Sequence, residues 1–384
     1  PSHLDNTVKD LRRRLRIHGR QLGDLRDNLT KSQETVRLKE EIAYEHWHRM
    51  LFARFLAENN LLMYPDENNP ISITLEECEE LAVEQGLNNG WEVAARYAAK
   101  MLPQIFRLSS PVFELKLPKN RLRQLEQLLT SLSDETFLAS DSLGWVYQFW
   151  QAKRKDEVNA SEVKIGAREL PAVTQLFTED YMVSFLLDNS LGAWWAAKKL
   201  GITDEEVGVE AENEEELRQR VSIPGVPLEY LRFAQLADGT WIPAGGIFKS
   251  WPGDLNDLKV MDPSCGSGHF LVAAFLMLVP LRRELDSLTP LDAVSQVLSE
   301  NIHGLELDQR CVELAAFSLA LAAWKYPDAG GYGPLPELNI ACSGLSISAK
   351  EEDWLSLAYN TNIRMSLEEL YKDFKDASIL GSLI

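Results

Sequence analysis

The sequence lacks the features of a metal-binding, disulfide-bonded or membrane protein. Its 384 residues include only four cysteines, which lie far apart and form no paired spacing. Of the six histidines only His46 and His48 are close, and an i, i+2 pair on a helix points to different faces. No apolar run approaches the roughly 20 residues that a transmembrane helix needs, and no signal-peptide pattern occurs. We therefore expect reduced thiols, no metal site, no membrane association and a cytoplasmic location.

Positive charge is also scarce. The chain has 39 lysine and arginine residues against 58 aspartate and glutamate residues, which gives a formal net charge of -19. Affinity for duplex DNA rests largely on basic side chains that neutralise phosphates. If this protein acts on DNA, we expect much of the basic surface to lie outside this sequence.

Residues 1–135 are predicted to form an all-helical domain. Residues at alternating spacings of four and three run from residue 4 to residue 29 and are apolar except for His18, which is typical of a heptad seam. A second helix with an apolar and aromatic face is expected over residues 41–62, where it suits the core of a bundle. The expected domain is therefore a heptad helix joined to a helical bundle.

Arginines gather on one face of the predicted first helix. Arg12, Arg16 and Arg20 follow one another at i, i+4 steps, so they could form a ridge that contacts phosphate. The interspersed aspartates favour the alternative, a solvated helix face.

Residues 136–250 differ in composition from the predicted helical domain of residues 1–135. Aromatic clusters occupy the segment 142–195, and an acidic run at 204–216 indicates an exposed insertion or loop. Residues 223–252 are rich in proline and glycine and are expected to form a connector.

Residues 251–384 alternate strand and helix signals. Strands are predicted at 259–262, 302–307 and 338–342, with helices between them. This order implies an α/β domain with a partial, Rossmann-like, doubly wound parallel sheet. Ligands of such sheets sit beyond the carboxyl ends of the strands.

A glycine turn joins the first predicted strand to its helix in the segment VMDPSCGSGHFLVAAF. Asp262 ends the strand, and Gly266 and Gly268 allow the backbone to approach a ligand closely. Leu271 stands where a dinucleotide-binding turn has its third glycine, and the turn has no P-loop lysine. The pattern therefore argues against a pyrophosphate cradle.

The stretch DPSCGSGHF closely resembles motif I of the class I S-adenosylmethionine methyltransferases, in the form seen in amino-methylating DNA methyltransferases. The resemblance implies that this stretch binds S-adenosyl-L-methionine. It also implies that Glu306 holds the ribose hydroxyls, and that Phe177 and Thr178 form motif X against the methionine part. Glu179 replaces the usual proline of that motif. Ser343 replaces an aspartate that many relatives use to accept a hydrogen bond from the adenine amino group.

The resemblance thus implies a cofactor site made of the glycine turn, the acidic strand end and two flanking segments. Its members are Phe177, Thr178, Asp262, Pro263, Cys265, Gly266, Ser267, Gly268, His269, Phe270, Glu306, Leu307 and Ser343.

The methyl-accepting motif of this family is missing from the sequence. The family uses N-P-P-Y or a close variant to hold the exocyclic amine and stack the flipped base, and no Pro-Pro occurs here. We therefore assign no catalytic residue. We expect the sequence to be an N-terminal part that stops before that motif and is inactive by itself.

The order LGWVYQFW, PAVTQLFT, DPSCGSGHF resembles the large adenine-N6 methyltransferases of BREX-type phage defence and of fused restriction-modification enzymes. This resemblance implies site-specific methylation of double-stranded DNA, bound mainly through parts outside this sequence, and protein partners of a defence system. Two alternatives stay open. The acceptor could be cytosine N4, RNA or protein, or the chain could be a non-catalytic scaffold module.

Overall fold

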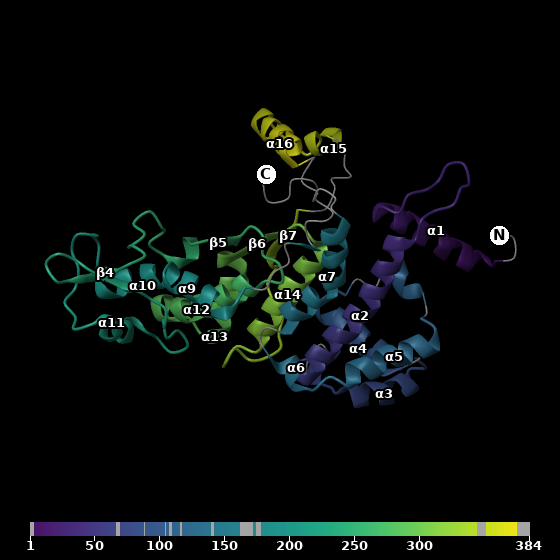
Figure 1. The fold of residues 1–384 in the computed structure, drawn as a ribbon, viewed down its shortest axis with the longest axis horizontal. Helices are drawn as coiled ribbons and strands as arrows, with labels where there is room; N and C mark the ends of the chain where they lie inside the picture. The colour runs from purple at the N-terminus through teal and green to yellow at the C-terminus, as the bar shows by residue number, and fades with distance from the viewer. Residues whose placement is uncertain are drawn as a thin grey trace. The chain divides into compact units, whose positions relative to one another are not determined.

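The chain folds into two compact units, residues 1–142 and 143–384 (Figure 1). The computed structural model describes residues 4–66, 70–87, 89–103, 105–106, 110–115, 117–139, 142–161, 172–173, 178–343 and 351–374. The first unit ends seven residues after the predicted boundary at 135. The second unit joins the two segments that the sequence analysis separated at residue 250, because side chains from both segments share one hydrophobic core.

The described residues of the first unit are mainly helical. A two-residue antiparallel pair, β1 with β2, interrupts its helices. Its elements are α1 (Asn6–Gln21), α2 (Val36–Glu58), β1 (Met63–Tyr64), β2 (Ile71–Ser72), α3 (Leu75–Glu84), α4 (Gly90–Met101), η1 (Pro111–Glu114), α5 (Lys119–Thr130) and α6 (Glu135–Leu138).

The predicted heptad helix over residues 4–29 is wrong in its second half. Helix α1 ends at Gln21, and Gly23 follows in the left-handed region with φ 99°. The carboxylate of Asp24 then accepts two backbone N–H groups at the start of α2, at 3.0 and 3.1 Å. Leu25 and Leu29, which the heptad pattern placed in a seam, are 70% and 94% exposed. The first helix therefore ends before Asp24, and the Asp24 side chain instead caps the start of α2.

The second unit mixes helices with short strands. Its elements are α7 (Ser142–Ser161), α9 (Asp180–Asp188), α10 (Leu191–Leu200), α11 (Glu214–Val221), β3 (Phe233–Gln235), β4 (Trp241–Pro243), η2 (Leu255–Asp257), β5 (Val260–Asp262), α12 (His269–Asp286), α13 (Pro290–Gln296), η3 (Val297–Asn301), β6 (Ile302–Glu306), α14 (Gln309–Trp324), β7 (Asn339–Cys342), α15 (Glu351–Leu355) and α16 (Thr361–Phe374).

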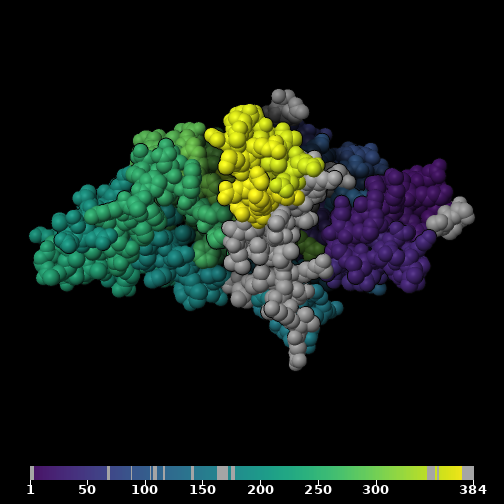
Figure 2. All heavy atoms as spheres, turned by 90° about the horizontal axis from the view of Figure 1, so that it is seen from above, coloured from purple at the N-terminus to yellow at the C-terminus, as the bar shows by residue number. Residues whose placement is uncertain are grey.

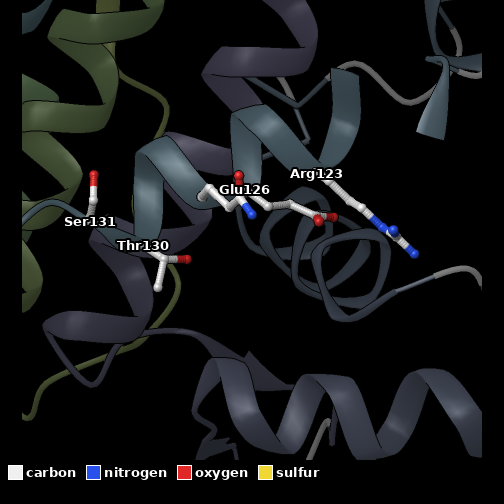
Figure 3. A pocket seen from close by; sticks show the side chains of 5 residues that line it. Arg123, Glu126, Thr130 and Ser131 are labelled. Atoms are coloured by element: carbon white, nitrogen blue, oxygen red, sulfur yellow. The ribbon is translucent and has the colours of Figure 1, made fainter. Parts of the chain in front are cut away.

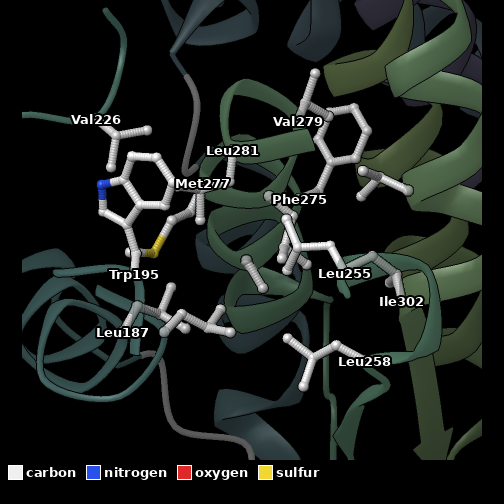
Figure 4. Close-up of a cluster of buried hydrophobic side chains, with 14 of the residues drawn as sticks. Leu187, Trp195, Val226, Leu255, Leu258, Phe275, Met277, Val279, Leu281 and Ile302 are labelled. Atoms are coloured by element: carbon white, nitrogen blue, oxygen red, sulfur yellow. The ribbon is translucent and has the colours of Figure 1, made fainter. Parts of the chain in front are cut away.

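Strands β5, β6 and β7 form a parallel sheet in that order, and their bounds lie within one residue of the predictions. The crossover helices α12 and α14 contact each other and β6, so both lie on the same face of the sheet. Figure 4 shows the core around α12, where Met277 lies beside Trp195 from the preceding segment, while Phe275 and Ile302 lie on the other side of the same cluster. Burial of this apolar surface fixes the sheet against the helices.

Two irregular segments carry more structure than predicted. The acidic run at 204–216 contains the start of α11, where the Asn213 side chain accepts the N–H of Glu216 at 2.9 Å. The expected connector at 223–252 contains an antiparallel hairpin of β3 and β4. Helix capping and strand pairing therefore organise both segments.

Within the described ranges, no helix is both long enough and apolar enough to cross a membrane.

Candidate functional site

Polar side chains from three neighbouring strands meet at one edge of the parallel sheet. Asp262 ends β5, Glu306 ends β6, and Ser343 directly follows β7. Because the strands are parallel and adjacent, their carboxyl ends lie at the same edge (Figure 1). The structure therefore brings together the acidic and hydroxyl residues that the sequence indicated from three distant segments.

The two glycines of the turn after β5 have different roles. Both have positive φ, 52° at Gly266 and 84° at Gly268. A Cβ at Gly268 would lie 2.8 Å from the Cα of Ala315, so glycine is needed there to pack the turn against α14. A Cβ at Gly266 would meet nothing within 4 Å. Gly266 thus borders open space, whereas Gly268 lies in a tight contact.

Cys265 anchors the turn to the sheet. Its backbone N–H donates to the carbonyl oxygen of Leu305 on β6 at 3.0 Å, and its carbonyl accepts the N–H of Gly268 at 2.8 Å. The side chain is 5% exposed. Burial, followed by the charges of Glu306 and Asp262, raises the pKa of the Cys265 thiol. The thiol therefore stays protonated and serves packing rather than nucleophilic chemistry.

The carboxylate of Glu306 holds the turn and its own strand end together. Its Oε2 accepts the N–H of Gly266 at 2.8 Å, while Oε1 accepts the N–H groups of Leu307 at 2.7 Å and Asp308 at 3.0 Å. The residue is 8% exposed. The sequence indicated Glu306 as a site residue, but this structural use of its carboxylate was not predicted.

Asp262 is a half-buried carboxylate beside the same turn. It accepts the N–H of Ser264 at 3.0 Å, which lowers the pKa of the carboxyl, but burial is the larger effect and the pKa is raised. No basic side chain of the described residues forms an ion pair with it. A cation beside this carboxylate would stabilise its ionised form.

Ser343 joins the ends of β6 and β7. Its backbone N–H and its hydroxyl both donate to the carbonyl oxygen of Glu306, at 2.8 and 3.3 Å. The donor capacity of the hydroxyl is therefore used, while its oxygen can still accept a hydrogen bond. A role for Ser343 in accepting a ligand amine stays a prediction.

A contact between His269 and Asp180 connects α9 with the start of α12. Nε2 of His269 lies 2.9 Å from Oδ1 of Asp180, the first residue of α9. Thr178 is half-buried two residues before α9, whereas Phe177 lies outside the described residues. Glu179 has φ -59°, which is the value that the expected proline would impose. The replacement of proline by Glu179 thus leaves the backbone conformation as a proline would set it.

The remaining predicted residues are parts of the turn or its flanks. Pro263 and Ser267 belong to the turn, Phe270 packs against the core from the first turn of α12, and the N–H of Leu307 donates to Glu306.

A contact that the sequence analysis missed joins α7 to the acidic strand end. The hydroxyl of Tyr147, which is 1% exposed, donates to Oδ2 of Asp308 at 2.5 Å and accepts from Nε2 of Gln151 at 2.7 Å. Asp308 also caps α14 by accepting the N–H of Arg310 at 3.0 Å. The sequence shows the aromatic cluster LGWVYQFW that contains Tyr147, but it does not show that Tyr147 contacts Asp308.

A hollow in the first unit has different properties. It measures about 420 Å³ and is lined by α5 and the residue that follows it: Arg123, Glu126, Gln127, Thr130 and Ser131 (Figure 3). Its lining comes from one helix surface and shows no nucleophile with a neighbouring base. In the part of the chain that the structure describes, no group of three or more potential ligands could hold a metal ion. The sheet edge is therefore the stronger candidate site.

Comparison with known proteins agrees with this choice. Residues 248–330, which contain the turn and β6, match the family model "MmeI, DNA-methyltransferase domain". The chain is 28% identical over 266 residues to the adenine-specific methyltransferase BrxX of Escherichia coli O9:H4 (strain HS), which covers 68% of this chain and 20% of that protein. It is 22% identical over 355 residues to the adenine-specific methyltransferase PglX of Lacticaseibacillus casei (strain Zhang), with 83% of this chain and 28% of that protein covered.

A third relative combines two activities in its name. The putative type II restriction enzyme and methyltransferase RM.MjaORFECS2P of Methanocaldococcus jannaschii is 28% identical over 140 residues, which is 32% of this chain and 12% of that protein. The chain thus spans 20% of the length of BrxX and 28% of the length of PglX. The chain is thus similar to the adenine-specific methyltransferases BrxX and PglX, and its match to the DNA-methyltransferase domain model includes the turn and the acidic strand end.

Proposed function

We propose that the sheet edge formed by residues 262–270 and Glu306 binds S-adenosyl-L-methionine, and that the protein methylates N6 of adenine in specific sites of double-stranded DNA. The observation that carries this proposal is the open space at Gly266 next to two carboxylates that hold the same turn: Glu306 accepts the N–H of Gly266, and Asp262 accepts the N–H of Ser264. The names of BrxX and PglX support adenine rather than cytosine as the acceptor.

The charges of the site fit this cofactor. S-adenosyl-L-methionine carries a sulfonium and an ammonium group, and the half-buried Asp262 has no cationic partner among the described residues. A cofactor cation there would lower the pKa that burial raises, which is a gain in binding free energy. The cofactor would supply an electrophilic methyl group next to the turn.

Glu306 fits the ribose of the cofactor, with one condition. An ionised carboxylate offers about four acceptor positions, and three N–H groups already use it. Holding both ribose hydroxyls therefore requires one of these N–H groups to be released. The bond to Gly266 is the one that links Glu306 to the turn, so we assign the exchange to that bond.

The proposal extends to the fold and the setting of the protein. We propose that β5, β6 and β7 are one half of a Rossmann-like, doubly wound sheet, and that Phe177 and Thr178 flank the methionine part of the cofactor. We further propose a role in restriction-modification or phage defence, with duplex DNA and defence proteins as partners and a cytoplasmic location. The relative from Methanocaldococcus jannaschii, a putative restriction enzyme and methyltransferase, supports the restriction-modification part of this proposal. We assign no residue of this chain to the methyl-accepting base.

Isothermal titration calorimetry of residues 1–384 with S-adenosyl-L-methionine tests the proposal. We expect saturable binding that weakens in Asp262→Ala and stays unchanged in Glu337→Gln, which neutralises an exposed acid of the same unit. Absence of binding, or an equal effect of both substitutions, would refute the assignment of the pocket.

A further inference from the structure

Helix α1 presents its basic residues on one side. At 100° per residue, five basic side chains fall within an arc of about 100°. We call these residues the basic stripe of α1: Lys9, Arg12, Arg13, Arg16 and Arg20. Arg16 is half-buried and the other four are exposed.

Packing fixes the direction of the stripe. The opposite side of α1 carries Leu11 and Leu15, both half-buried, and the helix contacts α2 and η1. Gly19 is buried near the end of the helix, where a Cβ would lie 3.1 Å from Oδ2 of Asp24. The helix therefore cannot roll to bury its basic side. Figure 2 shows the N-terminal residues (purple) at the surface of their unit.

Most of the stripe keeps its charge uncompensated. Asp10 pairs with Arg13 at 2.8 Å and with Arg14, which lies off the stripe. No ion pair between described residues involves Lys9, Arg12, Arg16 or Arg20.

Two guanidinium groups of the stripe are oriented by neutral oxygens. Nη2 of Arg16 donates to the carbonyl of Lys31, and Nη1 of Arg20 donates to the side-chain oxygen of Gln33, both at 3.2 Å. These hydrogen bonds restrict the two side chains but leave their positive charges in place, because the acceptor oxygens are neutral. Both guanidinium groups can therefore still bind an anion.

The region that contains the stripe has a net positive charge, whereas the whole chain has a net negative charge. Residues 1–40 contain ten lysine and arginine residues against six aspartate and glutamate residues, whereas the whole chain has a net charge of -19. Repulsion from acidic regions is screened over about 10 Å at 0.1 M salt. A local polyanion contact is therefore compatible with a net acidic protein.

We propose that the basic stripe of α1 binds the phosphate backbone of double-stranded DNA, and the choice of DNA as the polyanion rests on the proposed function. Arg12, Arg16 and Arg20 lie about 6 Å apart along the helix axis, and guanidinium groups match phosphate geometry. Phosphate contacts position a protein on the duplex without reading its sequence. A membrane surface fits less well, because a membrane-binding helix needs one continuous free apolar face beside its charges. Leu11 and Leu15 are half-buried, and the exposed Val8 and Ile17 lie on opposite flanks of the stripe.

Fluorescence anisotropy with a labelled duplex, measured on residues 1–384 between 50 and 200 mM salt, tests the stripe. The triple substitution Arg12→Ala, Arg16→Ala and Arg20→Ala should weaken binding at least about tenfold and reduce the slope of log K against log salt by about 2 to 3. The matched control removes the same charge from exposed positions of α5 in the same unit, through Lys119→Ala, Arg121→Ala and Arg123→Ala. We expect the control to bind like the unsubstituted chain.

Further variants separate charge from folding and DNA from other anions. Replacement of the same three arginines by lysine should keep the salt slope, because the charge remains. No duplex binding by the unsubstituted chain, equal losses in both triple variants, or equal displacement by polyglutamate or duplex RNA would overturn the proposal. Calorimetry with S-adenosyl-L-methionine should be unchanged in the arginine variant. If the unsubstituted chain bound DNA through the stripe but bound no cofactor, the proposed function would fail while the stripe would stand.

Discussion

Glu306 and Gly266, forty residues apart, are joined by a hydrogen bond of 2.8 Å from the backbone N–H of the glycine to Oε2 of the carboxylate. This bond ties the glycine turn to the end of β6. A cofactor that binds this carboxylate through both ribose hydroxyls needs one of the positions that the three N–H groups use, and we assign the exchange to the bond with Gly266. The relationship therefore predicts that the turn and Glu306 respond together when the cofactor binds.

We expect Glu306→Gln to weaken binding of S-adenosyl-L-methionine by about 10- to 100-fold, because hydrogen bonds to a charged group contribute about 1.5–3 kcal/mol. An analogue without the ribose 2′-hydroxyl should lose less upon the same substitution, since one partner is already missing. Calorimetry with both ligands measures the difference. Glu337→Gln serves as the control, and an equal loss for the two ligands would argue against a ribose contact.

The two turn glycines should differ in their sensitivity to alanine. Gly266→Ala strains a left-handed backbone, at a cost of about 1–2 kcal/mol in the free energy of unfolding, but its methyl group meets no atom within 4 Å. Gly268→Ala adds an overlap with the backbone of Ala315, which should destabilise the unit by about 1–3 kcal/mol more.

Urea denaturation of both variants measures this order. Gly266→Ala should retain the fold yet lose cofactor affinity, because the methyl group occupies the space that the proposal gives to the ligand. Equal stabilities, or unchanged affinity in Gly266→Ala, would contradict the roles assigned to the two glycines.

Cofactor affinity should depend on pH through Asp262. Burial raises the pKa of this carboxyl in the free protein, and a bound cation would lower it. The affinity is therefore fully present above the raised pKa and falls as the pH drops through it, at a higher pH than an exposed aspartate would give. Titrations across the acidic range should show this loss in the unsubstituted chain. Asp262→Asn should bind weakly without that pH dependence, and a profile shared by both proteins would exclude Asp262 as the titrating group.

The strands, the glycine turn and the helices of the second unit were predictable because each depends on residues that are neighbours in the sequence. The segment from Val260 to Phe275 carries a strand, a glycine turn and a helix in one run, so hydrophobic pattern and turn chemistry were enough to place it. The strand ending at Glu306 was predicted for the same reason. The parallel arrangement followed from the alternation of strands and helices.

The errors lie where a residue acts on a distant part of the chain. Asp24 caps α2 rather than extending α1, and the heptad spacing of the leucines gave no sign of this competition. The hydrogen bond from Tyr147 to Asp308 joins residues that are 161 positions apart. The sequence of an aromatic cluster does not indicate which distant residue one of its side chains will contact. Phe177 lies outside the described residues, so its place beside the cofactor stays a prediction.

The contact between Tyr147 and Asp308 gives a last prediction about the second unit. Tyr147→Phe removes the hydroxyl and leaves the Gln151 amide and the Asp308 carboxylate each without one partner. Buried polar groups left unsatisfied cost about 1–3 kcal/mol, so the free energy of unfolding should fall by that amount. Phe149→Ala is the control on the same helix, because Phe149 is 71% exposed and should change stability by no more than about 0.5 kcal/mol. If the cofactor edge needs α7 for its position, Tyr147→Phe should also weaken S-adenosyl-L-methionine binding, whereas Phe149→Ala should leave it intact. If Tyr147→Phe lowers stability but leaves cofactor affinity unchanged, the only role of Tyr147 in this contact is to hold α7 against Asp308, the residue that caps α14.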